Sequence, residues 1–136
     1  LRPRRTKYRK AHKGYFKTKS GGSLRGTRVY YGEYGLQAAE GGRIRDKQLD
    51  NVKACVRLVM KSEKGAKLIL RAFPDRPVTA KGAETRMGKG KGTVDYYATW
   101  VSEGRILFEI RGLPETSALE AFRIASQSLP IRTRVV

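Results

Sequence analysis

The chain has 136 residues, and 30 Lys and Arg against 12 Asp and Glu give it a formal net charge of +18. This length suits one domain with one modest core and excludes two domains plus a tail. So large a charge excess attracts polyanions, and the sequence has neither a run long enough to span a membrane nor a helix that combines a basic face with a large apolar one, so nucleic acid is the expected partner. The single cysteine, Cys55, excludes an internal disulfide framework and a cysteine-cluster zinc site, and indicates a reducing compartment.

The positive charge is concentrated at the start of the chain. Residues 1–28 hold 11 of the 30 basic residues and no acid precedes Glu33, whereas the remaining 108 residues carry a net charge of +7. Because its apolar residues are too few to offset backbone entropy, we expect residues 1–26 to form an extended arm that orders only on a lattice of phosphates. Tyr8, Tyr15 and Phe16 could stack on exposed bases. The alternative is a solubilising or targeting tail.

Within this arm, cations and one histidine are the expected RNA contacts. His12 has no histidine, cysteine or paired carboxylate near it in the sequence, so contact with RNA or solvent is favoured over catalysis or metal binding. The predicted contact residues are Arg2, Arg4, Arg5, Lys7, Arg9, Lys10, His12, Lys13, Lys17, Lys19 and Arg25.

Residues 27–136 are expected to form a single α+β domain. It opens with a predicted hairpin of strands 27–31 and 34–38. Apolar residues then recur every three or four positions between Leu49 and Met60, which predicts a helix with Asp46 at its start and Gly65 past its end. A strand over 67–73 follows, ended by the prolines of 74–77.

A protruding loop is expected at residues 81–93. Glycine at every second position removes the Cβ atoms from one side of the backbone, so that side can lie against another surface while Lys89 and Lys91 project away. No apolar group lies between Gly88 and Gly92 to offset the cost of ordering, which favours a polyanionic partner over a solvated hairpin tip without one. The predicted contact residues are Arg86, Met87, Gly88, Lys89, Gly90, Lys91 and Gly92.

Two familiar phosphate-binding motifs do not fit this loop. A Walker A loop requires Ser or Thr after its lysine and a helix beyond it, but Gly92 follows Lys91 and a strand pattern comes next. A dinucleotide fingerprint requires a different glycine spacing and a βαβ unit.

The rest of the chain completes the α+β pattern. Residues 93–101 and 105–111 are predicted to pair as an antiparallel hairpin around a turn at 102–104. A second helix starts within residues 112–115 and is ended by Pro130, and residues 131–136 form a short strand. The apolar residues expected to form the core face of this second helix are Leu119, Phe122, Ile124, Ala125 and Leu129. We therefore expect a mixed, mostly antiparallel sheet of five or six strands with two helices.

Catalytic chemistry finds little support in the sequence. There is one histidine, no close set of metal ligands, and most acids stand singly among basic or apolar residues. We expect no catalytic residues, no metal site, no cofactor and no small-molecule substrate. Two alternatives to a structural RNA-binding protein stay open at this point, an RNA-processing enzyme and a free-standing protein that compacts nucleic acid.

Four segments resemble one known family. Residues 2–10 with His12, Lys13 and Gly14 look like its opening, residues 73–79 and 86–92 look like its two central signatures, and residues 129–133 look like its end. The second central signature is highly specific. On these residues the chain is identified as a member of the large-subunit ribosomal protein L-sixteen family, related to the archaeal and eukaryotic L-ten-e proteins.

The resemblance implies an α/β-hammerhead-like fold on large-subunit ribosomal RNA (rRNA), with neighbouring ribosomal proteins and no membrane. It implies that the arm threads into rRNA and that residues 86–92 help to position aminoacyl-site tRNA near the peptidyl transferase centre. The chain departs from the family pattern at Arg45, Tyr97 and residues 15–23. These departures, with Leu1 in place of an initiator methionine, lead us to expect a mitochondrial ribosome, with a plastid or bacterial ribosome as alternatives.

Overall fold

The computed structural model describes residues 1–14 and 21–136. The elements are β1 (Tyr34–Ala38), β2 (Gly42–Arg45), α1 (Asp46–Met60), β3 (Lys67–Leu70), β4 (Arg76–Ala80), β5 (Thr93–Val101), β6 (Ile106–Arg111), α2 (Glu115–Gln127) and β7 (Thr133–Val135). The strands form a four-stranded sheet in the order β3-β6-β1-β7 and a three-stranded sheet in the order β2-β5-β4. Every pairing is antiparallel, so the predicted α+β class with two helices is confirmed.

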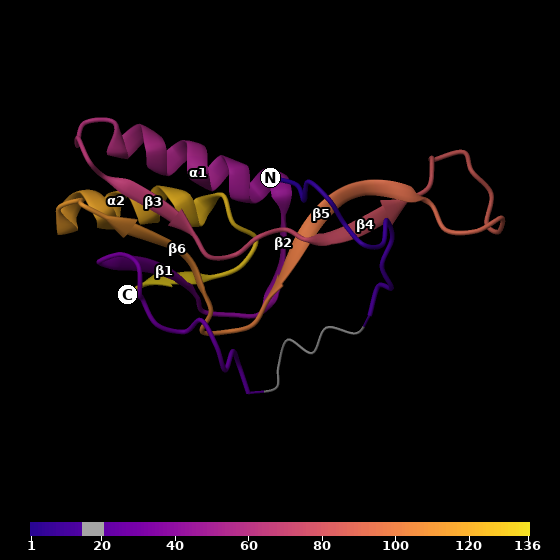
Figure 1. Cartoon of the computed structure of the whole chain (residues 1–136), viewed down its shortest axis with the longest axis horizontal. Helices are drawn as coiled ribbons and strands as arrows, with labels where there is room; N and C mark the ends of the chain where they lie inside the picture. Colours follow the sequence, from indigo (N-terminus) through magenta and orange to yellow (C-terminus); the bar gives the residue numbers. More distant parts are fainter. Residues whose placement is uncertain (15–20) are drawn as a thin grey trace.

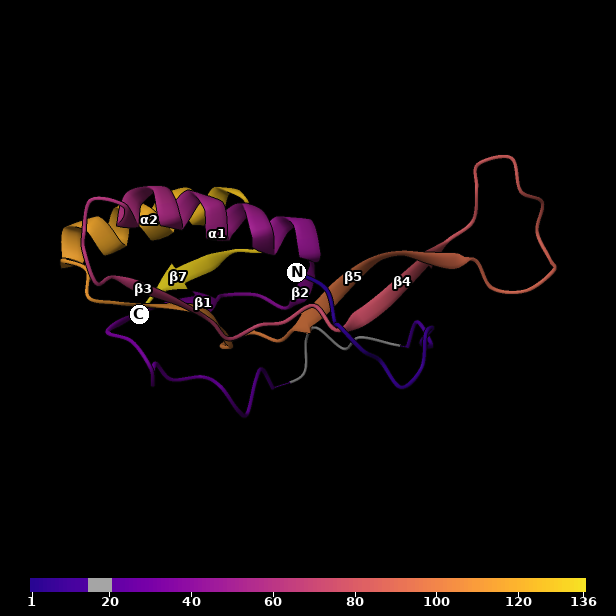
Figure 2. The same ribbon diagram turned by 45° about the horizontal axis from the view of Figure 1, so that its top comes forward.

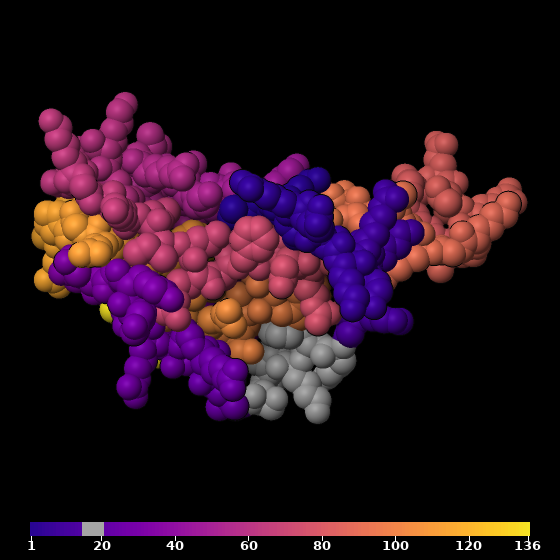
Figure 3. Space-filling model, viewed as in Figure 1, coloured from indigo at the N-terminus to yellow at the C-terminus, as the bar shows by residue number. Residues whose placement is uncertain are grey.

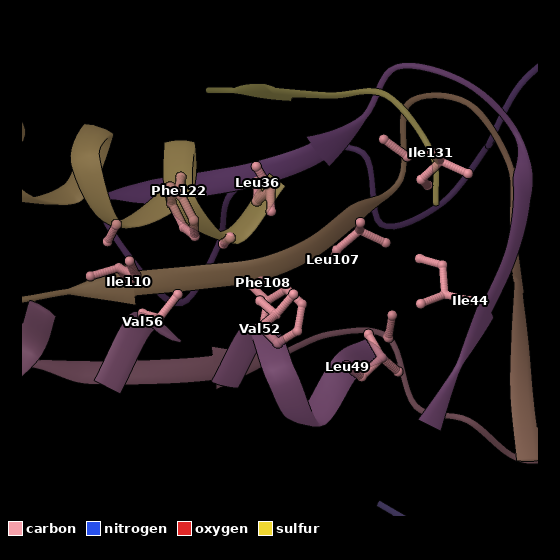
Figure 4. Packing of buried hydrophobic residues seen from close by; sticks show 14 of the residues in the cluster. Leu36, Ile44, Leu49, Val52, Val56, Leu107, Phe108, Ile110, Phe122 and Ile131 are labelled. Atoms are coloured by element: carbon pink, nitrogen blue, oxygen red, sulfur yellow. The ribbon is translucent and has the colours of Figure 1, made fainter. Parts of the chain in front are cut away.

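The two helices cover one face of the four-stranded sheet (Figures 1 and 2). The long β4–β5 hairpin projects away from the helices and this sheet, at the other end of the molecule. Helix α1 buries Leu49, Val52 and Val56, as its spacing predicted. These side chains meet residues from β1, β6 and α2 in one core (Figure 4).

The core stripe of α2 differs from the prediction. Its buried residues are Ala118, Ala121, Phe122 and Ala125, whereas Leu119 is 44% exposed. Small side chains on the buried side let α2 pack closely beside α1, and Phe122 supplies most of the volume. This close approach of the helices determines that Ala118, and not Leu119, is the buried residue.

The predicted hairpin of residues 93–101 and 105–111 is wrong. β5 pairs with β2 and β4, whereas β6 pairs with β1 and β3, so the chain passes from one sheet to the other at residues 102–105. The sequence analysis missed β2 and β4. β4 contains Pro77 but forms an edge of its sheet, where a missing N–H group is tolerated.

Residues 27–31 do not form the predicted strand either. The backbone N–H groups of Tyr30, Tyr31 and Gly32 instead donate to the Glu109 carboxylate, at 3.2, 2.6 and 2.7 Å. Arg71 Nη1 donates to the same carboxylate at 2.6 Å. Because these N–H groups bind a side chain, they are not available for a strand ladder.

Glu109 lies in the middle of β6 with no exposed surface. Burial raises its pKa, but the hydrogen bonds from Arg71 and from the N–H groups of residues 30–32 outweigh burial and hold the pKa below its ordinary value of 4.5. The carboxylate is therefore ionised in the folded protein at neutral pH.

We predict that the Glu109 carboxylate links stability to pH. Since its folded pKa is lower than its unfolded pKa, its contribution is complete above about 4.5 and is lost as pH falls through the folded pKa. Glu109→Gln leaves Arg71 without its counter-charge and should lower the free energy of unfolding at pH 7 by about 3 kcal/mol. Urea unfolding between pH 7 and 3 measures both effects.

The control is Glu120→Gln, because Glu120 is paired with Arg123 on the exposed surface of α2. Its effect at pH 7 should be much smaller. Equal stability of Glu109→Gln and wild type at pH 7 would contradict the proposed contribution of the Glu109 carboxylate to stability.

Candidate nucleic-acid interface

The loop between β4 and β5 spans residues 81–92 and stands clear of the two helices and the four-stranded sheet (Figures 1 and 2). It surrounds an open hollow of about 660 Å³. Lys81 Nζ donates to the carbonyl of Gly88 at 2.6 Å, and the N–H of Thr85 donates to the carbonyl of Gly82 at 3.0 Å. These bonds give the loop a defined shape although it contributes nothing to the core.

The backbone of this loop is not the extended ribbon that alternating glycines suggested. Gly88, Lys89 and Gly90 all have positive φ, at 101°, 59° and 90°. Lys89 is thus held in the left-handed region that lysine rarely adopts. Gly92 serves a different purpose, because a Cβ atom there would lie 2.4 Å from the carbonyl oxygen of Ala80. It lets the two strands come together at the base of the loop.

The loop cations fall into two groups. Lys81 and Lys91 donate to backbone carbonyls, of Gly88 and Ala11 respectively. Arg86 and Lys89 are exposed and make no hydrogen bond or ion pair within residues 1–14 and 21–136. Met87, between them in the sequence, is 96% exposed. The loop tip therefore exposes two cations and an apolar side chain to solvent.

The arm reaches the base of this loop. Lys10 Nζ donates to the carbonyl of Lys91 at 3.0 Å, while Lys91 Nζ donates to the carbonyl of Ala11. Figure 3 shows the arm, in indigo, beside the base of the loop, in salmon, where Lys91 lies. These reciprocal bonds join segments about 80 residues apart, which the sequence did not predict.

Other arm residues are placed as follows. Arg2 Nε lies 3.3 Å from an Asp46 carboxylate oxygen, and Lys7 lies over the ring of Tyr8. Arg4, Arg5 and Arg9 are exposed without a hydrogen bond or ion pair in the described part of the chain. Arg25 is also exposed. The predicted contacts Lys17 and Lys19, with Tyr15 and Phe16, lie outside the described residues.

His12 and Lys13 meet β2, β4 and β5 at a hollow of about 270 Å³. Lys91, Arg43 and Trp100 also line it. Nothing in this lining carries a negative charge, so an anion would meet only cations and neutral groups. The structure thus brings part of the predicted arm and part of the predicted loop to one positively charged surface.

Three arginines at this surface were missed by the sequence analysis. Arg43 and Arg76 lie 5.8 and 5.2 Å from the ring centroid of Trp100, and Arg45 lies 3.9 Å from that of Tyr96. These contacts hold the guanidinium groups over aromatic rings on the three-stranded sheet. The alternation of Arg43 and Arg45 around Ile44 was a signal of a strand with one basic face.

Within the described residues, no three His, Cys, Asp or Glu side chains gather into a possible metal site. No helix in that part of the chain is both long and apolar enough to cross a membrane.

We predict that the reciprocal lysine bonds hold the arm against the loop. Changing Lys10 and Lys91 together to Gln should increase the rate of chymotrypsin cleavage after Tyr8 several-fold, because each exposed bond of this kind is worth about 0.5–1.5 kcal/mol. Lys89→Gln is the control, since it removes a loop cation that does not bind the arm. Equal cleavage rates in all three proteins would show that the arm is held by other contacts.

We also predict that Gly92 is required for strand pairing at the base of the loop. Gly92→Ala forces its Cβ atom against the Ala80 backbone, and should lower the free energy of local opening of residues 76–80 and 93–97 by about 1–3 kcal/mol. Amide hydrogen exchange measures this opening. Gly82→Ala is the matched control, because its Cβ atom would meet only the Thr85 hydroxyl, at 3.2 Å.

Comparison with known proteins identifies the family. The family model for ribosomal protein L16p/L10e matches residues 3–136. The chain is 51% identical to large ribosomal subunit protein uL16 of Sulfurihydrogenibium over 136 residues, covering all of this chain and 95% of that protein. It is 48% identical to uL16 of Caulobacter vibrioides, covering all of this chain and 92% of that protein. Against uL16c of Ostreococcus tauri, the identity is 44% over 98% of this chain and 92% of that protein. The chain therefore belongs to the ribosomal protein L16p/L10e family.

Proposed function

We propose that this protein is a structural constituent of the large ribosomal subunit, where it binds rRNA and neighbouring ribosomal proteins. The observation that carries this proposal is the family match over residues 3–136, together with close relatives that are large-subunit proteins. The net charge of +18 agrees with an rRNA partner, because it requires neutralisation by a polyanion.

The arm and the loop base contribute phosphate contacts. Lys and Arg side chains neutralise phosphates and release counterions, so affinity should fall with salt at a log-log slope of about −0.7 to −0.9 per phosphate neutralised. Such contacts position the protein without reading sequence. Arg4, Arg5 and Arg9 are suited to this role because they are exposed on the arm.

The loop tip is proposed to contact tRNA in the aminoacyl site. Arg86 and Lys89 project from a loop that stands away from the body, and Met87 offers an apolar contact for a ribose or base. This role is inferred from the family resemblance and from the exposure of these three side chains. The protein acts by positioning RNA, and the family it belongs to is non-enzymatic.

The similarity to the relatives named above supports a location of the protein in the large ribosomal subunit. The relatives named above come from bacteria and from a chloroplast, so they favour a ribosome of bacterial type. The mitochondrial ribosome stays a prediction from the sequence departures.

We predict that changing Arg86, Lys89 and Lys91 together to Gln impairs accommodation of aminoacyl-tRNA more than it impairs incorporation into the subunit. The three side chains belong to a loop outside the core, so the fold should persist. The bond from Lys91 Nζ to the Ala11 carbonyl is lost, but Lys10 still donates to the carbonyl of residue 91 and should keep the arm in place. Incorporation is measured by sedimentation of purified ribosomes. Accommodation is measured by rapid kinetics with fluorescent tRNA.

The control changes Lys61, Lys64 and Lys67 together to Gln. It removes the same charge from exposed positions that run from the end of α1 to the first residue of β3, far from the loop in Figure 1. Accommodation should then be unchanged. Normal accommodation by the loop variant with lost incorporation would refute the proposed division of labour.

A further inference from the structure

Two tyrosine side chains lie on the surface at the far side of the body from the loop. Tyr30 is 80% exposed and Tyr31 is 57% exposed. Their rings meet edge to face, with centroids 4.9 Å apart and planes at 83°. Neither ring belongs to the core cluster, so packing does not explain them.

The backbone that carries these rings is fixed in place. Three successive N–H groups, of Tyr30, Tyr31 and Gly32, donate to the buried Glu109 carboxylate. A Cβ atom at Gly32 would lie 2.6 Å from the carbonyl oxygen of Ile110, which shows how closely this backbone approaches β6. The rings are thus presented by a stretch that has already lost its conformational freedom, so binding costs less entropy.

Two arginines lie beside the rings. The Arg71 guanidinium carbon lies 5.6 Å from the centroid of the Tyr31 ring, and its Nη1 also donates to the carbonyl of Arg28 at 2.7 Å. A hollow of about 270 Å³ lies among Gly26, Thr27, Arg28, Tyr30, Tyr31 and Arg71. The Glu109 carboxylate on β6 is paired with Arg71. Within residues 21–33 the acidic residue is Glu33, which is exposed.

This surface is separate from the arm and the loop. The stretch 21–33 runs across the side of the four-stranded sheet opposite the helices, at the other end of the molecule from residues 81–92 (Figures 1 and 2). One protein could therefore bind RNA at both ends.

We propose that Tyr30 and Tyr31, with Arg28 and Arg71, form a second RNA-binding surface that stacks unpaired bases. Exposed, rigid aromatic rings suit single-stranded RNA, because every base has a face that can stack. The exposed Arg28 offers a cation to a phosphate, whereas Arg71, paired with Glu109, holds the Tyr31 ring in place. The net positive charge of the chain favours RNA over a protein partner. The inference rests on the proposed rRNA binding and adds a site to it.

The test uses the full chain and a short labelled RNA without self-complementarity, together with an abasic strand of the same length. Changing Tyr30 and Tyr31 together to Ala should weaken binding to the RNA about tenfold and leave binding to the abasic strand unchanged. Because the change removes no charge, the salt slope should stay that of the wild type. Changing both residues to Phe keeps the rings and should preserve affinity.

Photo-crosslinking of the same RNA, carrying 4-thiouridine, provides a second measurement. Crosslinks mapped by mass spectrometry should include Tyr30 or Tyr31 in the wild type. Equal RNA affinity of the Ala variant and wild type, or crosslinks confined to other residues, would overturn the proposal. Thermal unfolding of the Ala variant should match wild type, since both rings are exposed.

The loop variant with Arg86, Lys89 and Lys91 changed to Gln separates this inference from the proposed function. If that variant loses affinity and salt slope while the Tyr variants do not, only the second surface is refuted. If wild type fails to bind the RNA at all, the proposed rRNA binding itself fails.

Discussion

The arrangement of the four-stranded sheet depends on the hydrogen bonds and the ion pair that the buried carboxylate of Glu109 makes. This carboxylate lies in the central part of β6, and a charge without solvent there must be matched by donors from the protein. Arg71, just after β3, supplies one donor and residues 30–32 supply three. One side chain thereby joins β6 to two segments that are distant in the sequence, and orders the stretch before β1.

The second constraint is that the residues that form the core and the residues that carry the exposed positive charge lie in different parts of the molecule. The four-stranded sheet and the two helices hold nearly all of the core, whereas the three-stranded sheet carries the projecting hairpin and its loop. Because the loop packs against neither the helices nor the four-stranded sheet, its exposed residues are free to serve a partner rather than the fold. This division lets a chain of +18 fold around an ordinary core while its cations stay exposed at the arm, the loop and the arginine-bearing strands.

Contacts within the chain also organise the interface in the absence of RNA. The reciprocal bonds of Lys10 and Lys91 place the arm beside the loop, and Arg43 and Arg76 lie over Trp100 next to that junction. Preorganised cations lose less entropy when phosphates arrive. The arm is thus partly ordered by the domain, although the sequence suggested that only phosphates would order it.

Composition and periodicity determined the class of the fold, the positions of both helices and the basic character of the arm and loop, because these depend on local pattern and summed charge. The residue signature of 86–92 was sufficient to indicate the family. Only the tertiary structure decided that β5 and β6 belong to different sheets, since each strand pattern was compatible with either pairing. It also decided that residues 27–31 bind Glu109 instead of forming a strand, and that Lys91 binds the arm. The last two outcomes depend on groups 70 or more residues apart, whose approach no local pattern encodes.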